Sequence, residues 1–186
     1  MVPLEPAISN LYATAHHYDR PNNMSPSGDN YSVVVDFVPG GDTAFEGAAA
    51  KTTSIHRVVA KNGQPFSDTT DTEYFNISPY KFLGRSFQSN PTLYYVASAQ
   101  GALPPTGKPG DTGQLYDATI YSNASKTGGP IGTSTQTWAV TADTATTDVF
   151  CVNSVTTLGG IAKTASDCYV IDVQGSVPSI RFTVPN

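Results

Sequence analysis

Short stretches of alternating or continuous apolar residues recur along the whole chain, separated by glycine, proline, asparagine and aspartate. Stretches rich in Val, Ile, Thr, Tyr and Phe and bounded by such turn residues are typical of β-strands. No segment shows a sustained helical period, and the best short candidate for a helix is Phe45–Lys51. The pattern predicts ten strands: Ile8–His17, Tyr31–Val38, Thr52–Ala60, Glu73–Ile77, Thr92–Ala99, Gln114–Ser122, Gly132–Thr141, Asp148–Thr156, Cys168–Val173 and Ser179–Val184.

The two faces of the expected strands differ in polarity. In the strand Gly132–Thr141, one face carries only Thr and Ala, and the other carries Ser134, Gln136, Trp138 and Val140. Several other strands likewise combine an apolar face with a mixed face. Because interior and exterior residues alternate along the strands of a barrel, this pattern favours a single antiparallel β-barrel of about eight to ten strands with a semi-polar lumen. A β-sandwich stays open as the alternative.

The chain is organised as one domain, residues 1–186. It contains no internal repeat, and the proline-rich loop Gln100–Gly113 is too short to link two folds. Ten basic and fifteen acidic residues give a formal net charge of -5, and no cluster of Lys or Arg is present. The charge therefore argues against nucleic acid and against an anionic membrane surface as partners. No apolar run approaches the roughly 20 residues of a membrane-spanning helix.

Three sequons for N-glycosylation begin at Asn30, Asn76 and Asn123. The residues after Met1 contain no signal-peptide core. Together with two cysteines and few lysines, the sequons favour a secreted protein whose signal peptide is replaced here by Met1.

Cys151 and Cys168 lie in two strand-like runs joined by a glycine-containing connection. Adjacent antiparallel strands bring such residues within disulfide range, so we expect a Cys151–Cys168 disulfide. Two buried free thiols are the alternative. No further Cys or His stands at ligand spacing, and we expect no metal site.

The common catalytic signatures are missing from the sequence. His16 and His17 fall on opposite faces of a strand, and a metal site with His56 and an acid is not required by any spacing. Most of the strand-associated acids are expected to face solvent or cap turns, and no catalytic pair is assigned among them; they are Asp36, Asp71, Glu73, Asp117, Asp167 and Asp172. Arg57 lies in the middle of a strand, where an inward orientation would be costly unless the guanidinium meets an acid or an oxyanion. Arg181 is expected to face outward.

Aromatic residues are the distinctive part of the composition, with ten Tyr, eight Phe and one Trp. Tyr and Trp combine a large apolar surface with one directed hydrogen bond. A lumen lined by them would suit a flat, partly oxygenated organic ligand. Adjacent Tyr94 and Tyr95 must face opposite sides of a strand, so at most one of them enters the lumen.

Four runs between residues 113 and 161 resemble a known motif series: Gly113-Gln114-Leu115-Tyr116-Asp117, Pro130-Ile131-Gly132-Thr133-Ser134, Phe150-Cys151-Val152-Asn153 and Thr157-Leu158-Gly159-Gly160-Ile161. They are similar to the Leu-Tyr-Asp, Ile-Gly-Thr, Cys and Leu-x-x-Gly-x-Ile elements of allene oxide cyclase-like and dirigent-like barrels. The Gly-Gly-Thr-Gly turn typical of those families is absent, and Ser122–Gly129 lengthens one hairpin. The resemblance implies a barrel that holds a reactive hydrophobic intermediate in one shape while a ring closes. Fungal hetero-Diels–Alderases, which join a tropolone quinone methide to a humulene-type terpene, belong to this group.

The first functional hypothesis is therefore a cofactor-free cyclase or pericyclase acting on a small hydrophobic terpenoid or polyketide intermediate in the lumen. Its expected catalytic residues are His56, Arg57 and Tyr116, and its expected substrate-binding residues are Tyr74, Phe75, Phe87, Tyr94 and Trp138. The rival hypothesis is a non-catalytic, lectin-like or lipocalin-like secreted binding protein, and a structural role stays open. Association of barrels into a homo-oligomer is plausible.

Overall fold

The computed structural model describes residues 1–24, 28–88 and 92–182. Within these ranges it contains one helix and eleven strands. These are α1 (Leu4–Ala13), β1 (His16–Met24), β2 (Asn30–Phe45), β3 (Ala48–Lys61), β4 (Gln64–Ile77), β5 (Tyr80–Phe87), β6 (Leu93–Gln100), β7 (Thr112–Tyr121), β8 (Gly132–Ala142), β9 (Thr147–Leu158), β10 (Ile161–Asp172) and β11 (Ser179–Phe182).

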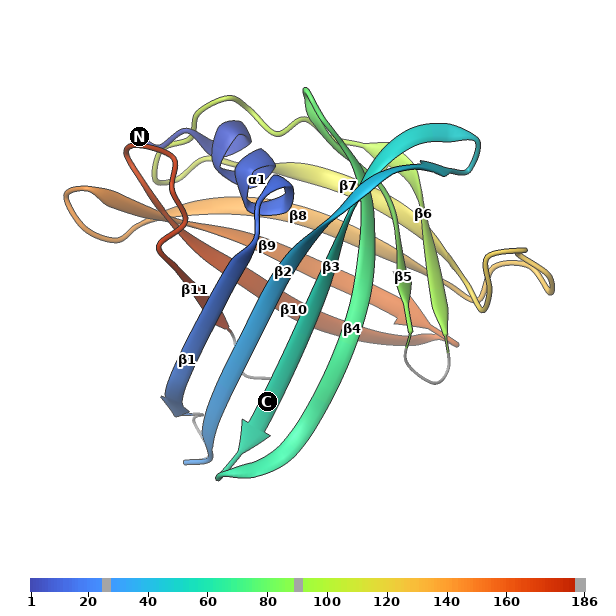
Figure 1. The fold of residues 1–186 in the computed structure, drawn as a ribbon, viewed down its shortest axis with the longest axis horizontal. Coiled ribbons are helices and arrows are strands. Elements are labelled where there is room, and N and C mark those ends of the chain that lie inside the picture. The colour runs from blue at the N-terminus through green and yellow to red at the C-terminus, as the bar shows by residue number, and fades with distance from the viewer. Residues whose placement is uncertain (25–27, 89–91, 183–186) are drawn as a thin grey trace.

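All eleven strands form one antiparallel sheet in which each strand pairs with the next along the chain. The sheet curls into a nearly closed barrel, so that β1 and β11 lie against each other across the remaining seam (Figure 1). The hydroxyl of Tyr18 on β1 crosses this seam and donates a 2.9 Å hydrogen bond to the carbonyl of Val177, just before β11. The all-β, antiparallel barrel expected from the sequence is confirmed.

The expected number of eight to ten strands is wrong. The strand β5 was not predicted. Only Ser78 and Pro79 separate it from β4, so the turn between the two strands is hard to recognise in the sequence. In the register of β4 and β5, Tyr74 pairs with Gly84 and Phe75 with Phe82, so that Leu83 forms a bulge in β5 and breaks the alternation of that strand.

The first expected strand, Ile8–His17, is also wrong, because residues 4–13 form α1 and β1 begins at His16. The buried residues of α1 include Leu4, Ile8, Leu11 and Tyr12, and this spacing is that of one helix face. The helix covers one end of the barrel (Figure 1). There the hydroxyl of Ser9 donates to the carbonyl of Ile77 at 3.2 Å.

Alternating burial along the strands confirms the expected faces. In β2 the inward side chains are Tyr31, Val33, Val35 and Phe37, and all four are buried. In β8 the buried residues are Ser134, Gln136, Trp138 and Val140, whereas the threonines between them are exposed. The mixed face of β8 thus points inward, which gives the interior its polar groups.

Tight turns connect several neighbouring strands. Asn62 and Gly63 both have positive φ (52° and 76°), as do Gly159 and Gly160 (54° and 82°). Such pairs form the two-residue turns that match the twist of antiparallel hairpins. Glu46 and Gly47 make a turn of the same kind between β2 and β3, so the best short candidate for a helix in the sequence, Phe45–Lys51, is not a helix.

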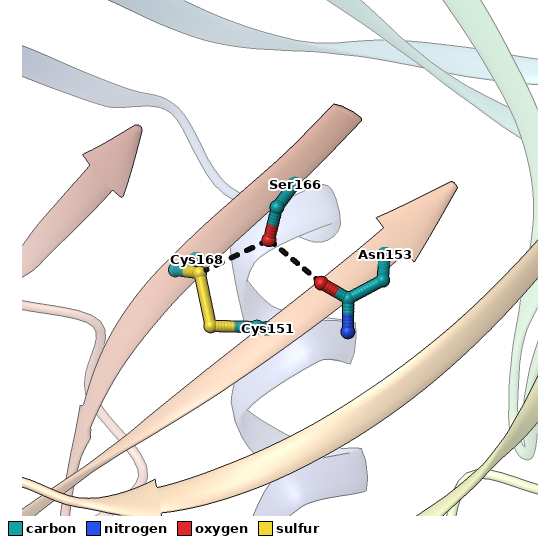
Figure 2. The surroundings of a disulfide bond; sticks show 4 residues. All are labelled: Cys151, Asn153, Ser166 and Cys168. Carbon is teal, nitrogen blue, oxygen red and sulfur yellow. Dashed lines mark hydrogen bonds between the residues drawn. A yellow bond between two sulfur atoms is a disulfide. The ribbon is translucent and has the colours of Figure 1, made fainter. Parts of the chain in front are cut away.

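The disulfide expected between Cys151 and Cys168 is confirmed by bonded sulfurs at 2.10 Å. The two residues are directly opposite each other on β9 and β10, with Cα atoms 4.0 Å apart. Figure 2 shows the Ser166 hydroxyl between the Cys168 sulfur and the Asn153 side chain, to which it donates at 2.8 Å. A disulfide of this kind is typical of an oxidising compartment.

In the described ranges no helix is of a length and apolarity that would let it cross a membrane. The one helix, α1, has 10 residues.

Candidate functional site

The barrel interior contains a cavity of about 220 Å³. Ile8 and Tyr12 of α1 lie at one end of it. At the other end the lining reaches Thr156 on β9 and the exposed residue Ala165 on β10, close to the turn between these strands. The cavity therefore has a closed end under the helix and an open end opposite it.

Five ionisable side chains meet in the interior, and we call them the lumen ion cluster: Arg57, Asp71, Glu73, Arg85 and Asp167. All except Asp71 line the cavity directly. Arg85 bonds to Glu73 through Nη2, and its Nε lies 3.2 Å from Asp71 Oδ2. Arg57 Nη2 donates to Asp167 Oδ1 at 3.1 Å. Arg57 thus points inward and meets an acid, without which an inward guanidinium would be costly.

The cluster is possible because residues two apart on a strand share a face. Asp71, Glu73 and the buried Phe75 are consecutive inward positions of β4. Arg85 stands opposite Glu73 in the register of β4 and β5. The general expectation that the strand-associated acids face solvent or cap turns therefore fails for Asp71, Glu73 and Asp167, since all three point inward and are held by arginines.

Burial controls the protonation of these groups. It raises the pKa of Asp71 to about 6, and the charge of Glu73 adds to the effect while Arg85 opposes it. For Arg85 and Arg57, burial alone would lower the pKa, but the neighbouring carboxylates outweigh it and raise the pKa overall. Both guanidinium groups therefore stay charged inside the barrel.

Tyrosine is the most frequent residue around the cavity, with Tyr12, Tyr80, Tyr95, Tyr116 and Tyr169 in its lining. Burial raises the pKa of all five, so each hydroxyl keeps its proton. Within the described parts of the chain, none of these five hydroxyls makes a hydrogen bond to another protein group. Because buried tyrosine hydroxyls usually have a partner, these are available to a molecule in the cavity.

Neutral polar groups lie toward the open end. The hydroxyls of Ser134 and Thr156 are 3.0 Å apart. Gln136 is buried and lines the cavity beside them. The lining therefore changes from mainly aromatic at the helix to mixed and polar at the opening.

Three of the residues expected from the sequence line the cavity: Arg57, Tyr116 and Phe87. Tyr116 stacks on Phe82 with ring centroids 3.8 Å apart, which fixes its ring. The guanidinium of Arg85 lies 5.6 Å from the ring centre of Phe87. These three residues come from β3, β7 and β5, so the barrel brings together positions that are distant in the sequence.

Two of the expected substrate-binding residues are buried in the core and do not line the cavity. Phe75 packs against Tyr12, with ring centroids 5.3 Å apart. The indole of Trp138 lies over Gly113, where an added Cβ would approach its ring atoms to 2.8 Å. Both residues thus shape the barrel wall around the cavity.

His56 lies on the outer face of the barrel. Its Nε2 is 2.8 Å from Asp68, and Asp36 lies between His56 and His17, 2.6 Å from His17 Nδ1. Within residues 1–24, 28–88 and 92–182, no group of three or more metal-ligating side chains has an arrangement that could hold a metal ion.

Tyr74 and Tyr94 also face outward, where the tip of the β2–β3 hairpin folds over the sheet. The ring of Phe45 stacks on Tyr74 at 4.4 Å, and it lies 5.3 Å from the ring of Tyr94. Phe45 sits over Gly84, where any Cβ would collide with its ring. The Tyr94 hydroxyl donates to Glu46 at 3.0 Å. These tyrosines therefore fasten the hairpin to the outside of the barrel.

Sequence reasoning missed several residues of the site. Ile8 and Tyr12 were assigned to the incorrect strand Ile8–His17 although they belong to α1. Tyr80 and Arg85 lie on β5, which was not predicted. Glu73 could have been found, because Glu73 and the apolar Phe75 share one face of the predicted strand Glu73–Ile77.

Comparison of the chain with protein-family models, with curated proteins and with solved structures finds no match. The resemblance to allene oxide cyclase-like and dirigent-like barrels is thus supported only as far as the nearly closed antiparallel barrel itself.

Proposed function

We propose that the protein is a cofactor-free cyclase or pericyclase that holds one small, hydrophobic, partly oxygenated molecule in the barrel lumen. The observation that carries the proposal is the ring of five lumen tyrosines whose hydroxyls have no hydrogen-bond partner among the described residues. A carbonyl or hydroxyl oxygen of a ligand would satisfy them. Holding the reacting ends of a molecule together is in itself a large contribution to ring closure.

The residues have distinct parts in this proposal. Tyr116, fixed by its stacking on Phe82, donates a hydrogen bond that polarises a ligand carbonyl. The donor is available at neutral pH because burial raises the pKa of Tyr116 well above its usual value. The aromatic walls exclude water and orient the apolar part of the molecule. Arg57 and Arg85 hold the inward carboxylates in place.

The cavity volume limits the size of the molecule. An apolar cavity of about 150 Å³ binds benzene, so about 220 Å³ fits roughly one ring system with its substituents. The tropolone quinone methide expected from the family resemblance contains one such ring. A humulene-type terpene partner would have to extend through the open end of the barrel.

A direct test uses achiral quinone methides and dienes that cyclise slowly by themselves. We expect the purified protein to raise the rate of product formation and to give an enantiomeric excess, measured by chiral chromatography. Tyr116→Phe should reduce the rate about a hundredfold, the lower end of the range for loss of one directed donor to a polarised oxygen. The matched control is Tyr121→Phe, which removes a hydroxyl from the same strand outside the cavity lining. An unchanged rate in Tyr116→Phe would contradict the role of this hydroxyl.

A non-catalytic, lipocalin-like or lectin-like binding protein is the second candidate. It is favoured by one observation: no histidine among the described residues lines the cavity, and both carboxylates in its lining are bonded to arginines. The same experiment separates the two functions. Saturable binding of the intermediates without any change in rate or stereochemistry would favour the binding protein.

Secretion belongs to the proposal as well. The disulfide fits an oxidising compartment, and we propose that the protein passes through the secretory pathway. Of the three sequon asparagines, Asn30 is half-buried with its side-chain oxygen inaccessible. Asn76 and Asn123 lie on the surface side of the barrel, at the end of β4 and in the β7–β8 loop. A mass shift after enzymatic removal of N-glycans would test their use.

A further inference from the structure

The lumen ion cluster has an excess of negative charge. It contains three carboxylates, Asp71, Glu73 and Asp167, and two guanidinium groups, Arg57 and Arg85. With every group ionised, the described interior therefore carries a net charge of -1. Charges in a buried site interact more strongly than charges at the surface, because less solvent screens them.

Both guanidinium groups are engaged by carboxylates. Arg85 bonds to Glu73 through one nitrogen and faces Asp71 with another, 3.2 Å away. Arg57 donates to Asp167 at 3.1 Å and is half-buried near the open end. An anionic ligand that contacts either guanidinium would lie close to the carboxylate that already neutralises it, or would displace that carboxylate and leave it buried without its arginine. Like-charge contact at a binding site and the breaking of a buried pair are both costly.

The rest of the lining also favours positive charge. Seven aromatic rings surround the cavity, and the face of an aromatic ring carries partial negative charge that attracts cations. One such contact already exists inside the barrel, between Arg85 and the ring of Phe87. The raised pKa of Asp71, caused first by burial and then by Glu73, agrees with an interior in which added negative charge is unfavourable.

We propose that the lumen accepts neutral and cationic ring compounds and rejects anionic ones. This inference rests on the proposed function, since it names the class of molecule that the lumen binds. Asp167 is the specificity-determining residue. It pairs with Arg57, and of the carboxylates paired with an arginine it lies nearest the open end. For a cyclase, the proposal implies a substrate without a carboxylate.

The test compares three compounds of nearly the same shape and different charge: benzylamine, benzyl alcohol and benzoate. Their dissociation constants are measured by chemical-shift titration of the full chain at pH 7.5 and 0.15 M salt, where surface charges are screened beyond about 8 Å. We expect benzoate to bind at least tenfold more weakly than benzyl alcohol, and benzylamine to bind at least as tightly. Like-charge contact at a binding site is sufficient for such a difference.

Two variants locate the effect. Asp167→Asn removes the carboxylate that neutralises Arg57 and should tighten benzoate binding about tenfold while weakening benzylamine. Asp68→Asn changes the total charge equally, but Asp68 lies on the outer face and is 72% exposed; we expect all three affinities to stay within about twofold.

The outcomes separate this inference from the proposed function. If none of the three compounds binds in the cavity, binding in the lumen itself is refuted. If all three bind with equal affinity, or if Asp68→Asn shifts benzoate as much as Asp167→Asn does, the lumen binds ligands but does not select by charge, and only this inference fails.

Discussion

At the scale of single residues, Asp71 is the group whose ionisation is most affected by the fold. It is buried beside Glu73, and Arg85 and Arg57 offset only part of the cost of its charge. Its pKa is therefore near 6 in the folded protein, compared with 3.8 for an unperturbed aspartate. A carboxyl group with a raised pKa binds its proton more tightly in the folded state than in the unfolded state.

This difference links stability to pH. The stabilisation from protonated Asp71 is fully present below about pH 4 and is lost as the pH rises through 6, a change of up to about 3 kcal/mol for a shift of about two units. We expect Asp71→Asn to remove this decline. The measurement is the melting temperature between pH 4 and pH 7 for the wild type, for Asp71→Asn and for the outer-face control Asp68→Asn. Parallel curves for all three proteins would contradict the shift.

At the scale of elements, the β9–β10 hairpin is held in three ways. Its strands pair over their full length from Thr147 to Asp172, and its turn has two glycines with positive φ. The disulfide then joins residues directly opposite each other, and a small apolar cluster of Val149 and Val170 packs beside it on the outer face. The covalent bond therefore reinforces a register that the backbone hydrogen bonds already define.

From this arrangement we expect the double variant Cys151→Ser, Cys168→Ser to fold into the same barrel with lower stability. The sequence separation of 17 residues corresponds to about 3 kcal/mol in the chain-entropy account of disulfides. Urea titration followed by circular dichroism measures the loss, and wild-type protein treated with reductant should show the same midpoint as the variant. A fully unfolded variant would show that the hairpin register depends on the disulfide.

At the scale of the whole molecule, the seam between β1 and β11 is the place where the barrel wall lacks strand pairing among the described residues. Ten strand pairs close most of the wall, but β1 and β11 lie side by side without pairing in the described residues. The bond from Tyr18 to Val177 crosses this seam, and burial raises the pKa of Tyr18 to about 12, so that the donor keeps its proton. In the wall formed by β5 to β7, by contrast, each strand is hydrogen-bonded to the next, although the β6–β7 ladder has a bulge between Ala97 and Ala99.

Tyr18→Phe should therefore loosen the seam selectively. Removing one hydrogen bond of about 1 kcal/mol corresponds to about fivefold faster local opening. We expect amide hydrogen exchange to accelerate by about this factor in β1 and β11, while β6 and β7 serve as the internal reference. Equal acceleration across all strands would show that the bond contributes to global stability instead.

The sequence by itself determined the features that depend on neighbouring residues. The alternation in β2 and β8, the glycine turns and the pairing of Cys151 with Cys168 all follow from a period of two and from hairpins between consecutive strands. The all-β class and the inward direction of Ser134, Gln136 and Trp138 could be predicted for the same reason. Even so, the pattern did not reveal the helix, because a short helical face with buried residues at Ile8 and Leu11 can be mistaken for a strand.

Only the tertiary structure decided which groups meet in the lumen. Arg57 and Asp167 are separated by 110 residues, and their contact depends on closing the barrel. Bulges also shift the alternation, as between Gln114 and Tyr116, where Leu115 and Tyr116 are both buried. Each bulge changes which face the following residues occupy. The faces of the aromatic residues, and hence the composition of the lumen, are therefore set by strand pairing across the whole barrel and not by local pattern.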